Sequence, residues 1–593
     1  MSQSEQPQLR VIIDDHAQVD PGVLARLTSQ IGHSGNTATV MRAPIEILEA
    51  VISAQSHGPV IVIDSQLVTG QAMLDALIRG QWSTNAALVR KGVSQHFDQA
   101  CRVANKHVLS VASSVHRVTQ PSHEQLGLVR IGSGSQVREA LVAARGYVSE
   151  LRSATAMTDM LTVILVRAAL PVAPLEPTGM CERATSNIGE VIVEADAQDD
   201  EDIRMKRALR SNDGFYSTFV LRKLSARVTM LALKNGWLPN QITLASLVIS
   251  AVAALFFATG SHALFIAGAL LVQLSIIVDC SDGEVARYTG VSSQLGAWLD
   301  AATDRVKEYA LYAGLAVGAM SHGENLWRLA MALVVLQTVR HLSDYNFVAV
   351  RGVRESALVV VPLSQSVDNG VASAGSLMDA SASLNSRRAI YWLKRVIYLP
   401  IGERWLIISV GAAVGSPRLV FNVLWFAGLF GLAYVTFGRV MRSRRWKHAQ
   451  EISGCEILER QIDPGFFMSW FLADGSHPLA GRFGWAIPSV LRLVELGVIA
   501  SVCRYHHIGY LWLFAVAFHH YDTMYRALAG FEFPAQLARL GLGVEIRTAM
   551  FVLCAVSFTA PLNAVLLIGG VYFSVLFVGI ASRQWIVQLT SAK

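Results

Sequence analysis

The stretch from Asp279 to Asp304 reads DCSDGEVARYTGVSSQLGAWLDAATD, and it joins two long apolar segments. Asp279 and Asp282 lie near the end of the first segment, whereas Asp300 and Asp304 lie near the start of the second. If both segments are helices, spacings of three and four residues place each pair of carboxylates on one helix face. A tight turn between the helices would then gather four acids at membrane depth.

Four neighbouring carboxylates repel one another and are costly to remove from water. They are stable together when a cation neutralises them, and carboxylate oxygens are suitable ligands for Mg²⁺ or Mn²⁺. We therefore expect Asp279, Asp282, Asp300 and Asp304 to hold one or two divalent ions, with two favoured. The alternative interpretation is a buried carboxylate network without activity.

Small residues and one arginine accompany these acids. Gly283 and Gly296 flank the acids, and Ala286 leaves similar space. Glycine on a helix face lets a bulky ligand or another backbone approach closely. Arg287 supplies a fixed positive charge that suits a phosphate group. With metal ions added, these residues describe a site for a diphosphate.

The eight residues named so far fit the signature D-x2-D-G-x2-A-R-x8-G-x3-D-x3-D, and residues 213–445 resemble the CDP-alcohol phosphotransferase family. The resemblance implies an enzyme that moves a phospho-alcohol or phosphatidyl group from a CDP-alcohol to an acceptor alcohol or phospho-alcohol and releases CMP. It also implies that Asp279, Asp282 and Asp300 bind the metal. Asp304 would share that site and serve as the general base. A homodimer through the membrane spans is a further expectation.

The resemblance also suggests where the nucleotide binds. The stretch Pro239–Thr243 looks like the family's entry to its first span, although a helix start with an Asn cap is the alternative. The residues expected to hold the cytidine diphosphate are Gly283, Ala286, Arg287, Gly296, Asn240 and Thr243. Arg340 and His341 lie inside the predicted fourth span, where a charge calls for a ligand or a partner. We expect them to bind an acceptor phosphate, with a salt bridge to Asp344 or a motif acid as the alternative.

Composition predicts a chain with several membrane spans. Hydrophobic residues make up 52%, charged residues 16%, and mean hydropathy is +0.40. Apolar runs near 20 residues match the thickness of a bilayer. Six spans are expected in the motif-bearing region, at about 241–260, 262–286, 294–318, 325–346, 404–416 and 418–440. About four more are expected at 484–503, 508–528, 545–560 and 562–581.

The net charge of +6 comes mainly from Lys and Arg at the ends of apolar runs. The positive-inside rule then places the N-terminal domain, the 287–293 turn, the 347–404 loop and the 442–482 segment in the cytoplasm, with the active site facing the same side. No basic module rich in stacking residues is present, so nucleic-acid binding is not expected. Six scattered cysteines without a CxxC pair indicate neither a disulfide scaffold nor a zinc site.

The expected organisation has four parts. Residues 1–205 form a cytoplasmic α/β domain, and residues 206–237 form a linker with an amphipathic helix that lies in the bilayer interface or, alternatively, on an ordinary protein surface. Residues 238–447 form the all-α membrane domain, and residues 448–593 form a further membrane domain of unknown role.

The α/β domain is expected to be Rossmann-like, with a mainly parallel sheet. Its predicted helices include Pro21–Ile31 and Ala72–Arg79. Its predicted strands are Arg10–Ile13, Ala38–Met41, Val60–Ile63, Ala87–Arg90, Val108–Ala112 and Val191–Glu194.

This domain resembles the nucleotidyltransferase domain of bifunctional inositol-phosphate cytidylyltransferase / di-inositol-phosphate-phosphate synthase proteins. Asp64 ends its acid-bearing strand, with Asp196 or a nearby acid as counterpart. The first strand and the residues after it read VIIDDHAQVD, without a glycine-rich loop, so few backbone N–H groups can point at a triphosphate. The turn at Gly132–Ser135 is only a weak phosphate-binding signal. We therefore expect a non-catalytic domain.

Two competing functions remain open. An ion-coupled transporter could use the intramembrane acids, but it would not require Arg287 and the two glycines at these spacings. A catalytically silent scaffold predicts no dependence on metal. In the tail, the histidines 506, 507, 519 and 520 with Asp522 could suggest a metal site, but a belt of polar aromatic residues at the membrane interface is favoured.

Overall fold

The computed structural model of the chain has two compact units, one within residues 1–208 and one from residue 209 onward. The described residues are 9–55, 57–79, 85–92, 99–104, 107–113, 116–152, 154–184, 187–209, 213–291, 293–357, 388–444, 458–459, 461–463, 479, 481–503, 507–529, 537, 540–557 and 561–591.

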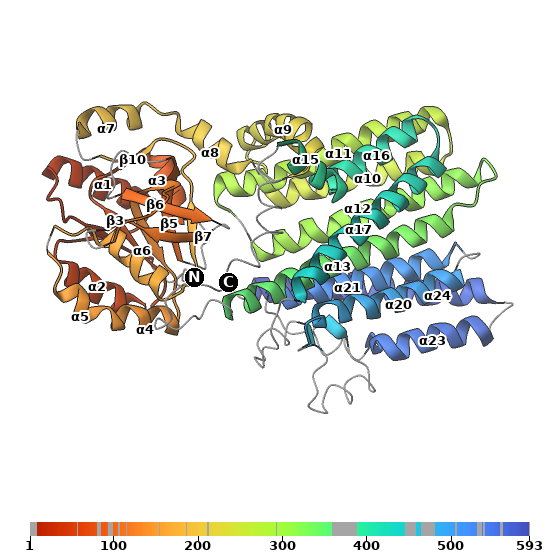
Figure 1. Cartoon of the computed structure of the whole chain (residues 1–593). Coiled ribbons are helices and arrows are strands. Elements are labelled where there is room, and N and C mark those ends of the chain that lie inside the picture. The colour runs from red at the N-terminus through yellow and green to blue at the C-terminus, as the bar shows by residue number, and fades with distance from the viewer. Residues whose placement is uncertain are drawn as a thin grey trace. The chain divides into compact units, whose positions relative to one another are not determined.

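The first unit is an α/β domain built on a mixed sheet (Figure 1). Its path has the order β2-β1-β3-β8-β5-β9, with β6 also paired to β8 and β7 paired to β6. The strands are β1 (Arg10–Asp14), β2 (Ala38–Met41), β3 (Val60–Asp64), β4 (Leu67–Thr69), β5 (Asn85–Lys91), β6 (Ala100–Ala104), β7 (His107–Val111), β8 (His123–Ile131), β9 (Val172–Leu175) and β10 (Cys181–Arg183). The helices are α1 (Pro21–His33), α2 (Pro44–Ala54), α3 (Gln71–Arg79), α4 (Ser135–Ala143), α5 (Arg145–Ser149), α6 (Met157–Arg167), α7 (Ile188–Asp196) and α8 (Asp200–Ala208).

Two expectations for this unit are wrong. The predicted strand Val191–Glu194 is part of helix α7, because Ile188, Val191, Ile192 and Ala195 recur at helical spacing and pack together with Val68. The sheet is also not mainly parallel. β1 pairs in parallel with β2 and β3, and β5 with β9, but β8 runs antiparallel to both β3 and β5.

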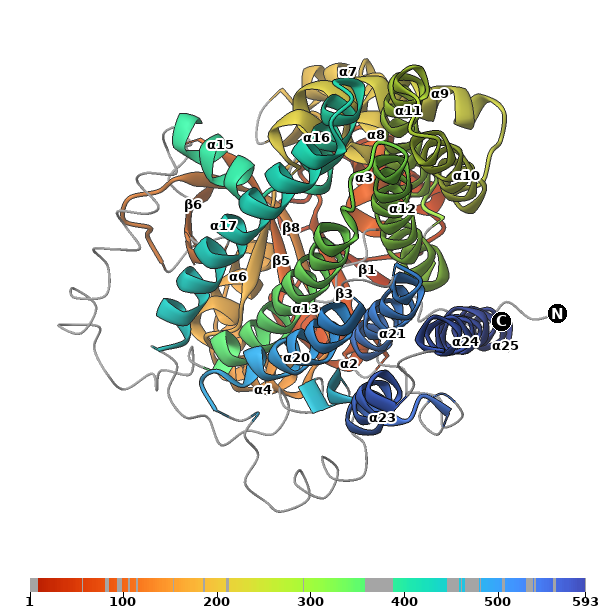
Figure 2. The same cartoon turned by 90° about the vertical axis from the view of Figure 1, so that its right-hand side faces the viewer.

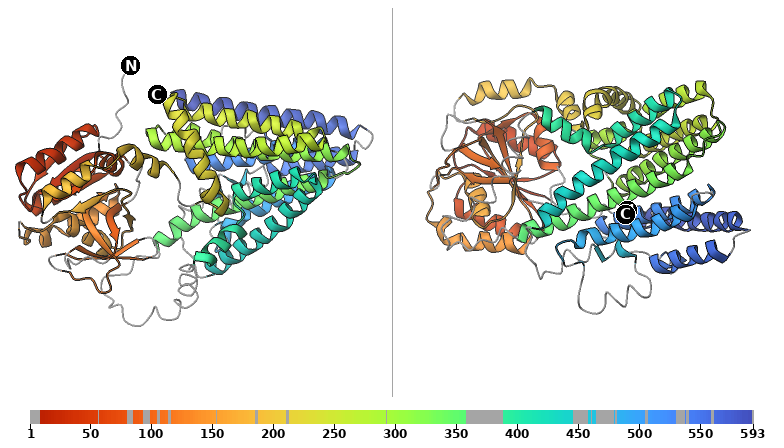
Figure 3. Two further views of the ribbon diagram at one scale, coloured as in Figure 1. Left: turned by 90° about the horizontal axis from the view of Figure 1, so that it is seen from above. Right: turned by 45° about the vertical axis from the view of Figure 1, so that its right-hand side comes forward.

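The second unit is a bundle of long helices, which run side by side in every view (Figures 1 and 3). Its first part comprises η2 (Ser217–Leu221), α9 (Arg222–Lys234), α10 (Pro239–Ala258), α11 (His262–Thr289), α12 (Gln294–Met320), α13 (Trp327–Ala357), α15 (Arg388–Ile397), α16 (Ile401–Ala413) and α17 (Pro417–Ser443). Its second part comprises η4 (Gly484–Ala486), α20 (Ile487–Val502), α21 (Gly509–Ala529), α23 (Gly543–Ser557), α24 (Leu562–Ser574), η6 (Val575–Ile580) and α25 (Ala581–Ser591).

Helices α10, α11 and α12 form the tightly packed centre of the first part. Gly314 and Gly318 of α12 face the backbone of α10, where an added Cβ would lie 2.3 Å from the Ala254 carbonyl oxygen and 2.0 Å from that of Phe257. Only glycine permits this approach, as in other close helix pairs in membranes. This close packing holds the C-terminal half of α12 against α10.

Five described helical segments are long and apolar enough to cross a membrane: Pro239–Ala258, His262–Thr289, Pro417–Ser443, Gly484–Val502 and Leu562–Val587. Helices α12 and α13 match the predicted third and fourth spans in position but carry many charged residues. The predicted fifth span is the short helix α16, which ends before Gly415, with Pro417 in the first turn of α17. An integral-membrane unit is thus supported, while the count of spans stays a prediction.

The second part of the bundle packs directly on the first. Helix α20 and helix α21 lie along α13, and α21 also contacts α12 (Figure 2). Buried side chains from both parts belong to one hydrophobic core, among them Leu311, Val334, Leu513 and Phe577. The two parts are therefore one folded body.

Candidate active site

The four motif aspartates come from the facing helices α11 and α12. Asp279 and Asp282 lie on α11, and Asp300 and Asp304 lie on α12. One carboxylate oxygen from each of Asp279, Asp282 and Asp300 lies within 4.8 Å of the others. This separation lets three oxygens share an ion at the usual ligand distances of about 2.0–2.6 Å.

Helix α10 supplies hydroxyl groups that orient two of these acids. Thr243 Oγ1 donates to Asp282, and Ser246 Oγ donates to Asp279 Oδ1 at 3.0 Å. Thr243 was expected to contact the nucleotide, but here it supports a candidate metal ligand. Ser246 follows Thr243 by three residues, so it lies on the same helix face, which is the signal that sequence reasoning missed.

Lys307 is the main site residue that the motif did not reveal. Lys307 is 1% exposed, and its ammonium group contacts Asp279 and lies 3.0 Å from Asp304 Oδ1. Lys307 follows Asp304 by three residues on α12, and a charge inside a predicted span was the available signal. Asp304 thus joins the other acids through a shared lysine.

The charges of this cluster do not balance. One ammonium group can neutralise only one of the four carboxylates. Two carboxylates about 4 Å apart repel by about 4 kcal/mol at an effective dielectric constant near 20. In addition, Asp304 Oδ1 is buried and pairs with the same ammonium group that contacts Asp279. An excess of buried carboxylate oxygens around one ammonium group fits a bound divalent cation.

The predicted diphosphate residues lie around this cluster. An added Cβ at Gly283 would lie 3.0 Å from Arg287 Nη1, so the exposed guanidinium folds back over that glycine. An added Cβ at Gly296 would lie 3.3 Å from Asn240 Oδ1, which brings the start of α10 beside the start of α12. Ala286 is half-buried on the last turns of α11. The structure therefore brings the candidate residues of three helices to one end of the bundle.

The amphipathic helix α9 is held against α11 by a buried acid. Glu284 accepts from Arg222 Nη1 at 2.6 Å, from Ser225 Oγ at 2.7 Å and from Thr229 Oγ1 at 2.6 Å. Glu284 occupies a variable position of the motif, which is why it was not predicted. These bonds anchor α9 beside the segment that carries Asp279 and Asp282.

Arg340 and His341 lie on α13 with different surroundings. Arg340 is 2% exposed, its guanidinium carbon lies 4.8 Å from the centre of the Tyr398 ring, and its Nη1 has no hydrogen-bond partner among the described residues. Within the same residues no salt bridge joins Arg340 to Asp344, which pairs with Arg439 and accepts from Tyr398.

His341 contacts the second part of the bundle. Its Nδ1 lies 2.8 Å from the Gln337 carbonyl oxygen and 3.1 Å from the Tyr521 hydroxyl oxygen. Of the two predicted acceptor residues, Arg340 therefore keeps an unused donor, whereas one nitrogen of His341 is already engaged.

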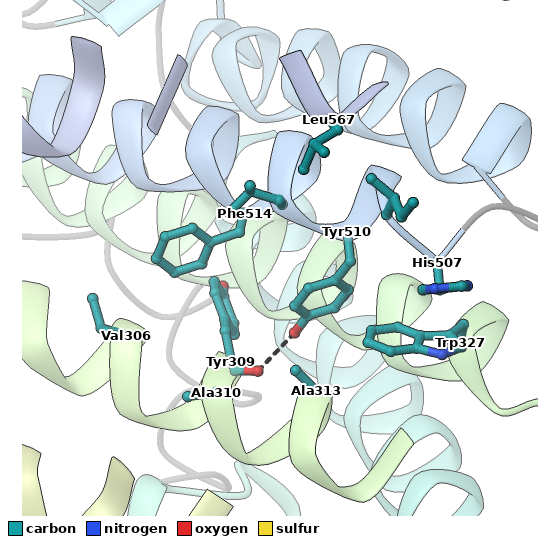
Figure 4. A pocket seen from close by; sticks show the side chains of 11 residues that line it. Val306, Tyr309, Ala310, Ala313, Trp327, His507, Tyr510, Phe514 and Leu567 are labelled. Atoms are coloured by element: carbon teal, nitrogen blue, oxygen red, sulfur yellow. Dashed lines mark hydrogen bonds between the residues drawn. The ribbon is translucent and has the colours of Figure 1, made fainter. Parts of the chain in front are cut away.

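An apolar pocket of about 400 Å³ lies on the other side of α12, between α12, α13, α21 and α24 (Figure 4). Tyr309, Ala313, Tyr510 and Phe514 are among its lining residues, and the Tyr510 hydroxyl donates to the Tyr309 carbonyl oxygen at 2.8 Å. No carboxylate lines this pocket. It is therefore separate from the aspartate cluster.

A second cluster of acids and histidines lies in the C-terminal helices. His519 Nε2 lies 2.9 Å from Asp463, and His520 Nε2 lies 2.7 Å from Glu495. Arg547 bridges the two acids at 3.0 Å and 2.6 Å. These histidines are each 1% exposed, so the expected interfacial belt is wrong for them; residue 506 lies outside the described residues. Three such groups lie close enough to hold a metal ion, but the arginine already neutralises the carboxylates.

The first unit holds a third buried cluster, at the carboxyl ends of β1 and β3. Asp14 and Asp64 are register partners on these strands. Arg183 contacts Asp64 and donates to Asp159 at 2.8 Å, so a guanidinium lies between the two acids. Asp196, the predicted counterpart of Asp64, instead pairs with Arg26.

Burial shifts the pKa values of this third cluster. It raises the pKa of Asp159 to about 6 against the opposing charge of Arg183, and it also raises the pKa of Asp64. Burial lowers the pKa of His16, but its contact with Asp14 at 3.5 Å and the charges of Asp64 and Asp14 outweigh this effect and raise it.

Comparison with known proteins identifies the class of the membrane unit. Residues 236–368 match the family described as CDP-alcohol phosphatidyltransferase, so the chain carries a transferase domain of this family. Residues 470–592 match a separate family of unknown function, DUF5941.

The similar curated proteins share only parts of their length with this chain. A bifunctional IPC transferase and DIPP synthase of Aquifex aeolicus is 36% identical over 114 residues, which is 19% of this chain and 26% of that protein. The protein of the same name from Rubrobacter xylanophilus is 36% identical over 161 residues, or 27% and 36%. The phosphatidylinositol phosphate synthase of Mycobacteroides abscessus is 33% identical over 132 residues, or 22% and 59%.

Proposed function

We propose that the membrane unit transfers a phospho-alcohol or phosphatidyl group from a CDP-alcohol to an acceptor alcohol and releases CMP. The observation that carries this proposal is the group of carboxylate oxygens from Asp279, Asp282 and Asp300, which lie within 4.8 Å of one another on two helices. The match of residues 236–368 to the transferase family supports it.

In the proposed reaction, the acceptor hydroxyl attacks the β-phosphorus of the CDP-alcohol. A bond forms between that oxygen and the β-phosphorus, the bond to the bridging oxygen of the diphosphate breaks, and CMP leaves. Asp304 accepts the hydroxyl proton as general base. Lys307 holds Asp304 and Asp279 in position through its two contacts.

The donor binds beside the aspartates. Arg287, which lies over Gly283, receives its phosphates, and Asn240 and Gly296 border the cytidine side, with Ala286 leaving space. Asp279, Asp282 and Asp300, with Asp304 sharing the site, would hold two Mg²⁺ or Mn²⁺ ions. When bound, these ions supply positive charge to the diphosphate oxygens.

A phosphorylated acceptor fits the remaining polar group best. Arg340 keeps a buried Nη1 without a hydrogen-bond partner, and a phosphate oxygen would satisfy it. The similar proteins include phosphatidylinositol phosphate synthases, so an inositol phosphate is the acceptor to test first. His341 would take part through its second nitrogen.

The other parts of the chain complete the proposal. The first unit is non-catalytic and faces the cytoplasm together with the active site. Its support is the absence of a glycine-rich loop after β1 and the guanidinium of Arg183 between Asp64 and Asp159. A homodimer in the bilayer is proposed from the family resemblance.

The direct test measures CMP release from CDP-diacylglycerol and from CDP-polyols by the full chain in detergent with Mg²⁺, with inositol phosphate or inositol as acceptor. We expect release that requires Mg²⁺, is faster with the phosphorylated acceptor and is lost in Asp304→Asn. Metal-independent behaviour with no CMP release from any donor would contradict the transferase. Ion transport without CMP release would favour a transporter instead.

A further inference from the structure

The C-terminal helices contact α12 at the turn that carries the motif. Trp298 lies between Gly296 and Asp300 in sequence, and it is 5% exposed. Its indole Nε1 donates to Asp522 Oδ1 of α21 at 3.2 Å. The two residues are 224 positions apart in the chain. A residue of the family domain is therefore bonded to the segment that matches a family of unknown function.

Asp522 is the centre of this contact. The same Oδ1 accepts from Trp585 Nε1 of α25 at 2.7 Å, and the Trp298 and Trp585 rings stack with centroids 5.3 Å apart. Asp522 Oδ2 accepts from Arg526 Nε at 2.8 Å, and Arg526 Cζ lies 5.1 Å from the Trp585 ring centroid. Asp522, Arg526 and Trp585 are each 1–2% exposed. The donors and the acceptor are satisfied within the group, so its geometry is well fixed.

Further along α12, the same helix α21 makes additional polar contacts. The guanidinium carbon of Arg305, the residue after Asp304, lies 5.5 Å from the Tyr521 ring centroid. The Tyr510 hydroxyl donates to the Tyr309 carbonyl oxygen at 2.8 Å. Helix α21 therefore holds α12 from the level of Trp298 to that of Tyr309.

These contacts lie on the face of α12 that points away from the aspartates. Trp298 precedes Asp300 by two residues, which is about 200° around an α-helix. A small rotation or shift of the first turns of α12 would therefore move Trp298 off Asp522 and would move Asp300 and Asp304 relative to Asp279. Repulsion among carboxylates of facing helices favours separation of α12 from α11 when no cation is bound, and the contacts at Lys307 and at Asp522 oppose that separation.

We infer that the C-terminal helices act as a clamp on α12, and that Trp298 and Asp522 are positioning residues for the metal-binding aspartates. The inference rests on the proposed metal site of the transferase. It assigns a role to the C-terminal helices, of which α21 and α25 hold the first turns of α12 at the distance from α11 that the bound ions require.

The test is Trp298→Phe in the full chain, purified in detergent. This variant keeps an aromatic ring for stacking but removes the N–H that bonds Asp522. Mn²⁺ binding is followed by the electron paramagnetic resonance signal of the free ion, without any substrate. We expect binding weaker by about 10-fold, the lower end of the effect when support of a metal ligand is lost. The Mg²⁺ concentration for half-maximal CMP release should rise by a similar factor, and excess Mg²⁺ should restore most of the rate.

Trp512→Phe is the matched control. Trp512 lies on the same helix α21 and is 1% exposed, but it packs against Phe551 and Phe573 within the C-terminal helices. This control should leave Mn²⁺ affinity within about twofold of the native value. Unchanged Mn²⁺ affinity in a folded Trp298→Phe, or an equal loss in Trp512→Phe, would overturn the clamp.

Two further arms keep the outcomes distinct. If Trp298→Phe does not fold, Trp585→Phe removes the other donor to the same oxygen without altering α12, and it is judged by the same Mn²⁺ criterion. If the native chain binds Mn²⁺ but releases no CMP, the proposed function fails, while the clamp is still decided by the Mn²⁺ affinities of the two variants.

Discussion

Two buried clusters of charged side chains in the same helical body differ in their balance of charge. The aspartate cluster of α11 and α12 has four carboxylates and one lysine, Lys307, which contacts two of them, Asp279 and Asp304. The C-terminal cluster has two carboxylates, Asp463 and Glu495, which pair with two arginines, Arg492 and Arg547, and with two histidines.

The difference separates a site that needs a ligand from one that is complete. Buried acids that already bond arginine and histidine gain little from a further cation, and removing one partner leaves a charge unpaired. Buried acids in excess are stable only when a cation from outside joins them. Proximity of carboxylates and histidines alone does not distinguish the two clusters, because both bring three candidate ligands within 4.8 Å.

The largest expected effect is on catalysis. Asp304→Asn should lower the rate of CMP release by about 10³-fold or more, because it removes both the proposed base and a charge that faces the transition state. His520→Gln in the balanced cluster should change the rate at saturating Mg²⁺ far less, by under about 10-fold. Steady-state CMP release by both variants measures this difference. Equal losses of rate in the two variants would contradict the distinction between the two clusters.

The next effect is on stability in the balanced cluster. Glu495→Gln leaves Arg547 and His520 without their acceptor charge, so we expect a loss of about 3–5 kcal/mol. Glu324→Gln is the control, because Glu324 forms a surface pair with Arg418 that is worth at most about 1 kcal/mol. Thermal unfolding in detergent should give a much lower melting temperature for Glu495→Gln alone. Equal melting temperatures would mean that the buried pairs are unimportant.

The buried acids of the first unit are intermediate between the two clusters, because Arg183 neutralises their charge only in part. The folded-state pKa of Asp159 is raised to about 6, so the proton binds more tightly in the folded state than in the unfolded state. Below pH 4 this tighter proton binding contributes its full stabilisation of the folded state, about 3 kcal/mol at most. The contribution disappears as the pH rises through 6. The raised pKa of His16 has the same effect: as the pH rises above the ordinary pKa of histidine, the stabilisation that His16 contributes is also lost.

Hydrogen exchange of the full chain, corrected for the intrinsic rate at each pH, tests this prediction. Amides of β1 and β3 should be protected more strongly at pH 5 than at pH 7.5. Asp159→Asn should remove most of that pH dependence. Protection that increases with pH would contradict the assigned direction of the shifts.

The smallest expected effect has the opposite sign to that of Glu495→Gln. Asp282→Asn relieves repulsion in the unbalanced cluster and still accepts the hydrogen bond of Thr243, so it should stabilise the metal-free protein by about 1–2 kcal/mol. The melting temperature in the presence of a chelator should therefore rise, whereas Mg²⁺ should stabilise only the native protein. A lower melting temperature of Asp282→Asn in the presence of the chelator would show that the charges of these acids are already balanced in the metal-free protein.

Local spacing in the sequence predicted the core of the candidate site. Three- and four-residue spacings placed Asp279, Asp282 and Asp300 on facing helices, where the structure groups their oxygens. Lys307 lies three residues after Asp304, but the motif does not include this position. Its charge was therefore not predicted to be part of the site. Trp298 and Asp522 meet only through the fold, and no local pattern links residues 224 positions apart.

In the first unit, too, local sequence patterns predicted the strands formed by short apolar runs but not the pairing that depends on the tertiary fold. Strands β1, β2 and β3 were predicted within one residue at each end from short apolar runs. Strand β8 carries polar residues such as His123, Glu124 and Gln125, which are buried by its position at the centre of the sheet. Its antiparallel direction follows from tertiary pairing and not from local propensity.

Everything proposed for the membrane unit depends on divalent cations bound by the aspartates of α11 and α12. An anomalous-diffraction map of crystals of the full chain grown with Mn²⁺ would locate such ions. We expect a strong peak about 2.0–2.4 Å from carboxylate oxygens of Asp279, Asp282 and Asp300, absent in Asp282→Asn. A map with no peak there, or with its only peak at Asp463 and His519, would contradict it.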